Sequence, residues 1–222
     1  MSDIFREVEE DVRQEQIINF LQTYMWHIVG AIVGLIVIFA AYNFWQSSAQ
    51  SSREEASDQF EQAMQLMAAG RGDEAQPILA ALREDRGLQD YGMLATLREA
   101  EIERDAGNID AAVALYDDVA ENADADRFIR DVAALASATV LINSGRGDEG
   151  VARLDTLIDD DSHVSAVALE HKAHYLYGQG EFDAARAIFT ELAEGEAATS
   201  SVALRARQTL SIIERTGPGV AQ

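Results

Sequence analysis

The feature that most constrains the fold of this chain is a glycine that returns at a nearly constant spacing. Four glycines in this series are separated by 37, 38 and 35 residues; they are Gly70, Gly107, Gly145 and Gly180. Self-similarity at a period of about 20–50 residues is typical of solenoids, in which small units stack and bury apolar surface against their neighbours. The spacing therefore predicts a row of similar units instead of one globular core.

The residues around each of these glycines also recur at fixed offsets. A small residue lies seven positions before the glycine, an aspartate three positions after it, and apolar residues nine and twelve positions after it. The small residues are Ala63, Ala100, Ala138 and Ala173, the aspartates are Asp73, Asp110, Asp148 and Asp183, and the apolar pairs are Leu79 and Leu82, Tyr116 and Val119, Leu154 and Leu157, and Phe189 and Leu192. Residues three apart share one face of a helix, so the pattern predicts helices with one buried face.

Each recurring residue has an expected physical role in a pair of helices. The glycine is predicted to end the first helix in the left-handed conformation. The aspartate is predicted to cap the second helix by accepting bonds from its free N–H groups, and Asp73 with Gln76 has the spacing of a capping box. The small residue is predicted to let the two helices pack closely.

Two copies of the turn contain the tripeptide Arg-Gly-Asp, which also occurs as a cell-adhesion signal. Residues 69–75 read AGRGDEA and residues 144–150 read SGRGDEG. The other two copies of the same slot read Gly-Asn-Ile-Asp and Gly-Glu-Phe-Asp. We therefore interpret the strings as turns of a repeated fold, with the arginine and the second glycine incidental, and not as adhesion signals.

These features resemble the tetratricopeptide repeat. The resemblance covers residues 53–195 as units of about 53–87, 88–124, 125–161 and 162–195. No unit has the usual Trp early in its first helix and none ends in the family's Pro, so the superhelical pitch stays open. Residues 200–215 are predicted to form a helix that caps the stack, within a domain over 46–215, and 216–222 form a tail. The expected fold class is all-α.

An uncharged stretch near the start predicts a membrane span. No residue from 16 to 52 carries a formal charge, and residues 24–45 read YMWHIVGAIVGLIVIFAAYNFW. These 22 residues are long enough to cross a hydrocarbon core of about 30 Å. Aromatic residues at both edges are typical of membrane interfaces. We predict a transmembrane helix over 24–45, preceded by an acidic amphipathic segment over 1–23. A signal peptide cleaved near residues 47–49 is the alternative, which the acidic flank and the long apolar run disfavour.

Two further features of the span bear on packing and orientation. Gly30 and Gly34 have the GxxxG spacing that lets two membrane helices approach closely, although glycine is also common in such helices. Homo-oligomerisation through them is therefore an open alternative. Arg6 and Arg13 before the span, against Arg53 after it, favour a cytoplasmic N-terminus.

Composition and motifs argue against several classes of function. The chain has 17 basic and 39 acidic residues, a formal net charge of −22, which disfavours nucleic acid and anionic lipid as partners. It has no Cys, which excludes disulfides and thiolate metal sites. Glu170, His171 and His174 have a helical spacing that could hold a metal, but no further ligand is evident, and we interpret them as helix surface. No phosphate-binding loop or nucleophile elbow occurs. We predict no enzyme, no catalytic residue and no metal or cofactor site.

The whole chain resembles the bacterial inner-membrane proteins that are ancillary subunits of the Sec translocon. They share an acidic N-terminal segment, one span and a tetratricopeptide-like domain, and the string IFREV at residues 4–8 is similar to the alphaproteobacterial branch. The resemblance implies a cytoplasmic N-terminus and a periplasmic repeat domain. It also implies two partners, the translocon subunits and a membrane-anchored periplasmic chaperone of the prolyl-isomerase class, and it implies no catalytic residues.

The predicted function is therefore that of a membrane-anchored interaction scaffold at the Sec translocon, which helps secreted chains pass to periplasmic chaperones. First helices of the units are expected to line a concave face. Candidate partner-binding residues there lie three and six positions before the glycine; they are Glu101, Arg104, His174 and Tyr177. A plain solvated face remains the alternative for these residues. A scaffold for another cell-envelope assembly and a self-associating structural membrane protein remain alternatives for the function.

Overall fold

The computed structural model describes residues 34–40, 42, 50–85, 87–160, 162–195 and 200–216. Regular structure in these residues is α-helical throughout, which confirms the all-α prediction for the repeat region. The chain divides into two compact units, Met1–Glu55 and Ala56–Gln222. The predicted amphipathic segment over 1–23, Gly30 and the tail beyond residue 216 lie outside the described residues.

The described part of the first compact unit includes a piece of the predicted membrane span. Residues 34–40 and 42 are helical. The side chains of residues 35–39 are 59–69% exposed, and a Cβ built on Gly34 would meet nothing within 4 Å. Within the described ranges, no helix is both long enough and apolar enough to cross a membrane. The span over 24–45 therefore stays a prediction.

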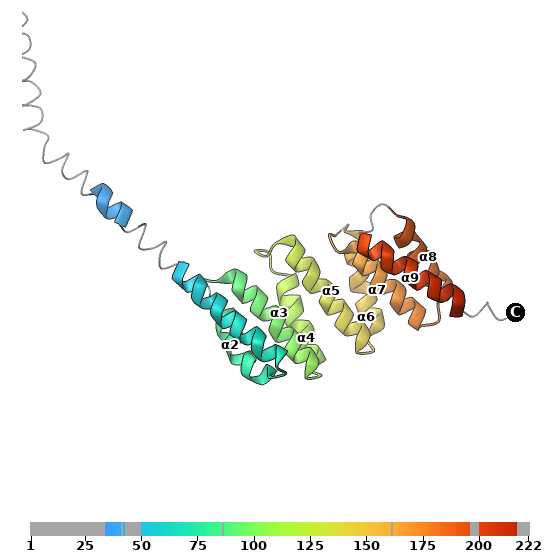
Figure 1. The fold of residues 1–222 in the computed structure, drawn as a ribbon, viewed down its shortest axis with the longest axis horizontal. Coiled ribbons are helices and arrows are strands. Elements are labelled where there is room, and N and C mark those ends of the chain that lie inside the picture. The colour runs from blue at the N-terminus through green and yellow to red at the C-terminus, as the bar shows by residue number, and fades with distance from the viewer. Residues whose placement is uncertain are drawn as a thin grey trace, which may run out of the picture. The chain divides into compact units, whose positions relative to one another are not determined.

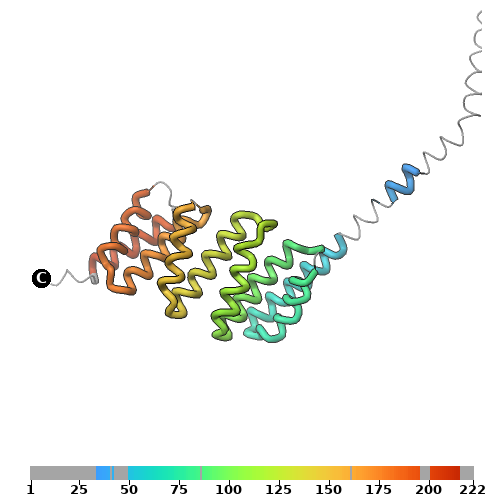
Figure 2. Tube along the Cα trace, turned by 180° about the vertical axis from the view of Figure 1, so that it is seen from behind, coloured from blue at the N-terminus to red at the C-terminus, as the bar shows by residue number. Residues whose placement is uncertain are grey.

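The second compact unit is a row of antiparallel helix pairs joined by short turns (Figures 1 and 2). Each helix packs against the helices before and after it in the chain, and α5 and α9 also touch α7. After the helical residues 56–68 come α2 (Gly72–Glu84), α3 (Gln89–Asp105), α4 (Ile109–Ala120), α5 (Arg127–Asn143), α6 (Gly147–Asp159), α7 (Ser165–Gly178), α8 (Phe182–Glu194) and α9 (Ser200–Thr216).

The recurring glycines end the first helix of each pair, as predicted. Their φ angles are +72°, +83°, +88° and +86°, in the left-handed region that favours glycine. In every copy the residue after the glycine donates its N–H to the carbonyl five positions earlier, at 2.8–3.0 Å. This is the bond of a Schellman turn, which satisfies a carbonyl that the helix end would otherwise leave free.

The recurring aspartates do not cap the second helices, so that prediction was wrong. Each aspartate is the second residue of its helix, and no side-chain cap bond is present at the start of α2, α4, α6 or α8. The capping box is also absent, because Gln76 donates to Glu103 at 3.1 Å. The carboxylates instead place negative charge in the first turn, near the positive end of the helix dipole. A side-chain cap does occur on α5, where Asp126 accepts from the N–H of Phe128 at 2.8 Å.

The predicted core positions are confirmed. The alanines seven positions before each glycine are completely buried, and the apolar residues at plus nine and plus twelve are at most 6% exposed. Apart from Val119, these residues belong to separate clusters along the row. In the last cluster, α9 adds Val202, Ala206 and Ile213 to Phe189 and Leu192 of α8, so α9 covers the apolar face at the end of the stack.

One glycine marks a close approach between paired helices. Gly150 is five positions after its turn glycine, where the other units have the buried residues Ala75, Ala112 and Ala185. A Cβ built on Gly150 would lie 2.6 Å from the carbonyl oxygen of Ala138 and 2.6 Å from Cγ1 of Ile142. The absence of a side chain at residue 150 therefore lets α6 pack directly on the backbone of α5.

Candidate functional site

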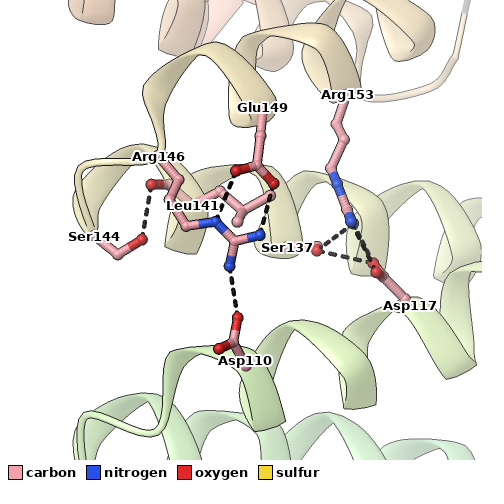
Figure 3. Close-up of polar contacts among 8 residues, drawn as sticks. All are labelled: Asp110, Asp117, Ser137, Leu141, Ser144, Arg146, Glu149 and Arg153. Carbon is pink, nitrogen blue, oxygen red and sulfur yellow. Dashed lines mark hydrogen bonds and ion pairs between the residues drawn. The ribbon is translucent and has the colours of Figure 1, made fainter.

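The second Arg-Gly-Asp string lies at the start of α6 and is held by ionic contacts (Figure 3). Arg146 binds both carboxylate oxygens of Glu149, at 2.9 and 2.6 Å, and its third nitrogen binds Asp110 of α4 at 2.7 Å. The pKa of Arg146 is raised, and its hydrogen bonds to Glu149 are the largest cause. In the first string, Arg71 binds Glu74 in the same bidentate way, at 2.6 and 2.5 Å. The arginines are therefore not incidental, because each is tied to a glutamate of its own turn.

The second glycine of each string has a different role in the two copies. A Cβ on Gly147 would overlap the ring of Tyr175 on α7, whose hydroxyl donates to Asp148 at 3.4 Å. A Cβ on Gly72 would lie 3.4 Å from Ile102, at the edge of ordinary contact. Our interpretation of this glycine as incidental is therefore wrong for Gly147, which makes room for the next unit.

We expect Gly147→Ala to lower the midpoint of thermal unfolding, whereas Gly72→Ala leaves it unchanged or raises it. The methyl group at residue 147 displaces the Tyr175 ring, while the one at residue 72 meets no overlap and favours the helix. Far-UV circular dichroism of the full chain in mild detergent measures both. Adding Tyr175→Ala should remove most of the penalty of Gly147→Ala; a penalty that persists would place its cause elsewhere.

A partly buried polar network joins the second and third units (Figure 3). Arg153 of α6 binds both carboxylate oxygens of Asp117 on α4, one of them at 2.9 Å. Ser137 of α5, which is completely buried, donates to Asp117 at 2.9 Å and accepts from Arg153 at 2.6 Å. Three helices from two units thus share one network, and every buried polar group in it has a partner.

In the second, third and fourth units, the residue eight positions before the turn glycine is polar and binds a side chain on the second helix of the preceding unit. Glu99 binds Arg83 at 2.5 Å, Ser137 binds Asp117, and Lys172 binds Asp155 at 2.5 Å. We call these three contacts the junction pairs. The sequence alone did not identify them. The available signal was a polar residue directly before the buried alanine of each first helix, but the partner lies on another unit and only the stacking identifies it.

Glu99 is 4% exposed, and its burial raises the pKa of its carboxyl, an effect that Arg83 only partly opposes. A carboxyl whose pKa is higher in the folded chain contributes stability that is fully present below its unfolded pKa and is lost as the pH rises through the folded pKa. We therefore expect the wild type to gain stability relative to Glu99→Gln as the pH falls from neutral to the ordinary carboxyl pKa of about 4.5. Urea unfolding of both proteins across that range measures the difference, and a constant difference would contradict the assignment.

The four residues predicted to bind partners lie in two separate places. Glu101 and Arg104 are on α3, where they pair with Arg98 at 2.5 Å and Asp105 at 2.9 Å. His174 and Tyr177 are on α7, two units further along, where His174 is exposed and its ring packs edge-on against buried Phe189. Tyr177 packs against Phe182 in the same way. The structure thus gives two separate pairs, and their role in partner binding remains a prediction.

The cluster around His171 is partly buried, unlike the helix surface that we expected. The Glu170 side chain is 7% exposed and accepts two bonds from Arg205 of α9, at 2.8 and 2.5 Å. Nδ1 of His171 lies 3.3 Å from the hydroxyl of Thr139 on α5. The pKa of His171 is lowered, and burial is the largest cause. These contacts join α7 to its neighbours. In the described part of the chain, no group of three or more His, Asp or Glu side chains is arranged to hold a metal ion.

Comparison with known proteins identifies the repeat region. The family model described as a tetratricopeptide repeat-like domain matches residues 19–209. Neither the search of curated proteins nor the search of solved structures gave a match. The match includes all four recurring glycines and most of α9.

Proposed function

Since the chain belongs to the tetratricopeptide repeat-like domain family, we propose that it is a non-catalytic scaffold that binds other proteins along its stacked helices. Solenoids offer partners an extended surface made from successive units. The observation that carries the proposal is the row of helix pairs itself. Polar and ionic contacts join one unit to the next, while charged and aromatic side chains such as Arg104 and His174 stay exposed at the surface of the row.

The proposed scaffold is anchored in the bacterial inner membrane by one helix over 24–45, with its N-terminus in the cytoplasm and the repeat domain in the periplasm. Support comes from the uncharged sequence between residues 16 and 52 and from the exposed apolar side chains of residues 35–39. Gly30 and Gly34 would face another helix in such a membrane assembly.

Its proposed place is the Sec translocon, where it links the passage of secreted chains to periplasmic chaperones. Partners would be the translocon subunits and a periplasmic chaperone of the prolyl-isomerase class. This step is supported by the whole-chain resemblance and by the family's use as a protein-binding fold.

Co-purification tests the proposed partners. The full chain, tagged at its C-terminus, is extracted in mild detergent and its bound proteins are identified by mass spectrometry, with residues 46–222 as the control. Recovery of translocon subunits and a chaperone would support the proposal, and their loss from the control would show that the span is needed. Recovery of another envelope complex would replace the translocon in the proposal, and recovery of the chain alone would favour self-association.

The orientation has its own test, because the natural chain has no Cys. Ser2→Cys and Gln222→Cys each introduce one thiol. With the outer membrane permeabilised and the inner membrane intact, an impermeant maleimide should label the thiol at residue 222 and reach the one at residue 2 only after lysis. The reverse pattern would invert the proposed topology.

A further inference from the structure

A pocket of about 200 Å³ lies between the first two repeat units, which cover about residues 53–87 and 88–124. Its walls come from the end of α2, the first half of α3 and the end of α4 with the turn that follows. Gly92, Met93 and Val119 contribute the apolar part of the lining, and Asp85, Asp118 and Asp124 contribute carboxylates. The volume is below the roughly 300–1,000 Å³ that is usual for small-molecule sites, and it suits one long side chain.

The electrostatics of this pocket favour a cation. Arg83 also lines it, but its charge is balanced by the buried Glu99 at 2.5 Å. No ion pair with a described residue neutralises Asp118 or Asp124, and both are exposed. Two helices, α2 and α4, end beside the pocket and add the negative ends of their dipoles. A positively charged group would therefore meet carboxylates that pair with no cation among the described residues, beside apolar side chains.

Gly92 in the lining of the pocket differs from the equivalent residues of the other units. It lies inside α3 and has no positive φ, so the backbone does not require glycine there. A Cβ at residue 92 would sit at ordinary contact distance, 3.5 Å from the carbonyl oxygens of Leu82 and Arg83. Other units have Glu55, Arg130 and Ser165 at this position. Glycine inside a helix is less stable than alanine, so this unit gives up helix stability at a residue that lines the pocket.

We propose that this pocket binds one protruding arginine or lysine side chain of a partner protein. The aliphatic stem would lie against Met93 and Val119, and the cationic head would reach Asp118 and Asp124, as long basic side chains do when they bury their stems and keep the charge at a polar rim. The inference rests on the proposed scaffold function, for which it supplies a binding position and the chemistry of the bound residue.

Methyl NMR of the full chain in detergent tests the pocket with defined probes. The chain has five Met residues, and Met93 lies in the pocket while Met64 and Met67 do not. With methyl-labelled Met, titration with Nα-acetyl-argininamide or Nα-acetyl-lysinamide should shift the Met93 signal to saturation and leave Met64 and Met67 unchanged. The neutral isostere Nα-acetyl-citrullinamide should produce no saturable shift.

Matched variants separate a built pocket from general attraction to an acidic protein. Asp118→Asn with Asp124→Asn should weaken probe binding roughly tenfold or more. Asp58→Asn with Asp73→Asn removes the same charge from exposed positions outside the pocket and should leave binding unchanged.

Three results would overturn the proposal: no saturable shift of Met93, an equal response to the citrulline probe, or equal weakening by the two aspartate pairs. Because these titrations contain no partner protein, such results would remove the pocket and leave the scaffold proposal to the co-purification. Failure of the co-purification would, in turn, leave probe binding intact.

Discussion

Replacing Phe189 by Ala is expected to lower the free energy of unfolding by about 3–5 kcal/mol. Phe189 is completely buried and is the largest fully buried side chain in the described core. It packs in the cluster that joins α8 to α9, so the cavity would open between the fourth unit and its capping helix. Urea unfolding of the full chain in mild detergent, followed by far-UV circular dichroism, measures the loss.

Phe128→Ala is the matched control for this change. Phe128 is 50% exposed at the start of α5, so the same truncation should alter stability by no more than about 0.5 kcal/mol. Equal losses from the two variants would mean that α9 does not seal the end of the stack. A small loss from both would have the same meaning.

Gly150→Ala is expected to destabilise the repeat domain by about 1–3 kcal/mol, even though alanine favours helix. The new methyl group would lie 2.6 Å from the carbonyl oxygen of Ala138, and a backbone atom cannot move aside as the end of a side chain can. Helices α5 and α6 would have to separate, and the neighbouring contact between Arg153 and Ser137 would lengthen. The same urea titration measures this effect.

Gly178→Ala makes the same chemical change where there is room. A Cβ on Gly178 would meet nothing within 4 Å. Its stability should be unchanged or slightly higher, because alanine is the better helix former. If Gly150→Ala were equally harmless, the close packing of α6 on α5 would be wrong.

The turns and the core were predictable because they depend on local chemistry. A left-handed residue at a helix end calls for glycine, and apolar residues three apart must share a face, so spacing alone located Gly107, Tyr116 and Val119. The role of the aspartates was not predictable at that level. Only one residue separates each turn glycine from the next helix, so residues such as Arg71 and Asn108 occupy the N-cap position. The aspartate is then already the second residue of the helix and cannot cap it.

The polar contacts between units could not be predicted from the sequence, for a different reason. Arg153 and Asp117 are 36 residues apart, and only the stacking of α4 on α5 and α6 brings them together. The two pairs of candidate binding residues illustrate the same limit. Their equal offsets from a glycine placed them on equivalent helices, but equivalence between units is not proximity. The pocket includes Gly92, which differs from the equivalent residues of the other units. A comparison of recurring positions therefore does not indicate it.

The junction pairs mean that units with a shared pattern cannot be permuted. Arg83 lies thirteen positions after the turn glycine of its unit, and its counterpart in the third unit is Ile158, so exchanging the second and third units would leave the buried Glu99 without its cation. The same exchange would place Ala80, the first unit's counterpart of Asp117, before Ser137 and remove the acceptor of that hydroxyl. The polar contacts therefore fix the order of the first three units, whereas Lys172 would find an aspartate at the same position of either the second or the third unit. A stack in which the second and third units were exchanged would contain an unpaired buried carboxylate at one boundary.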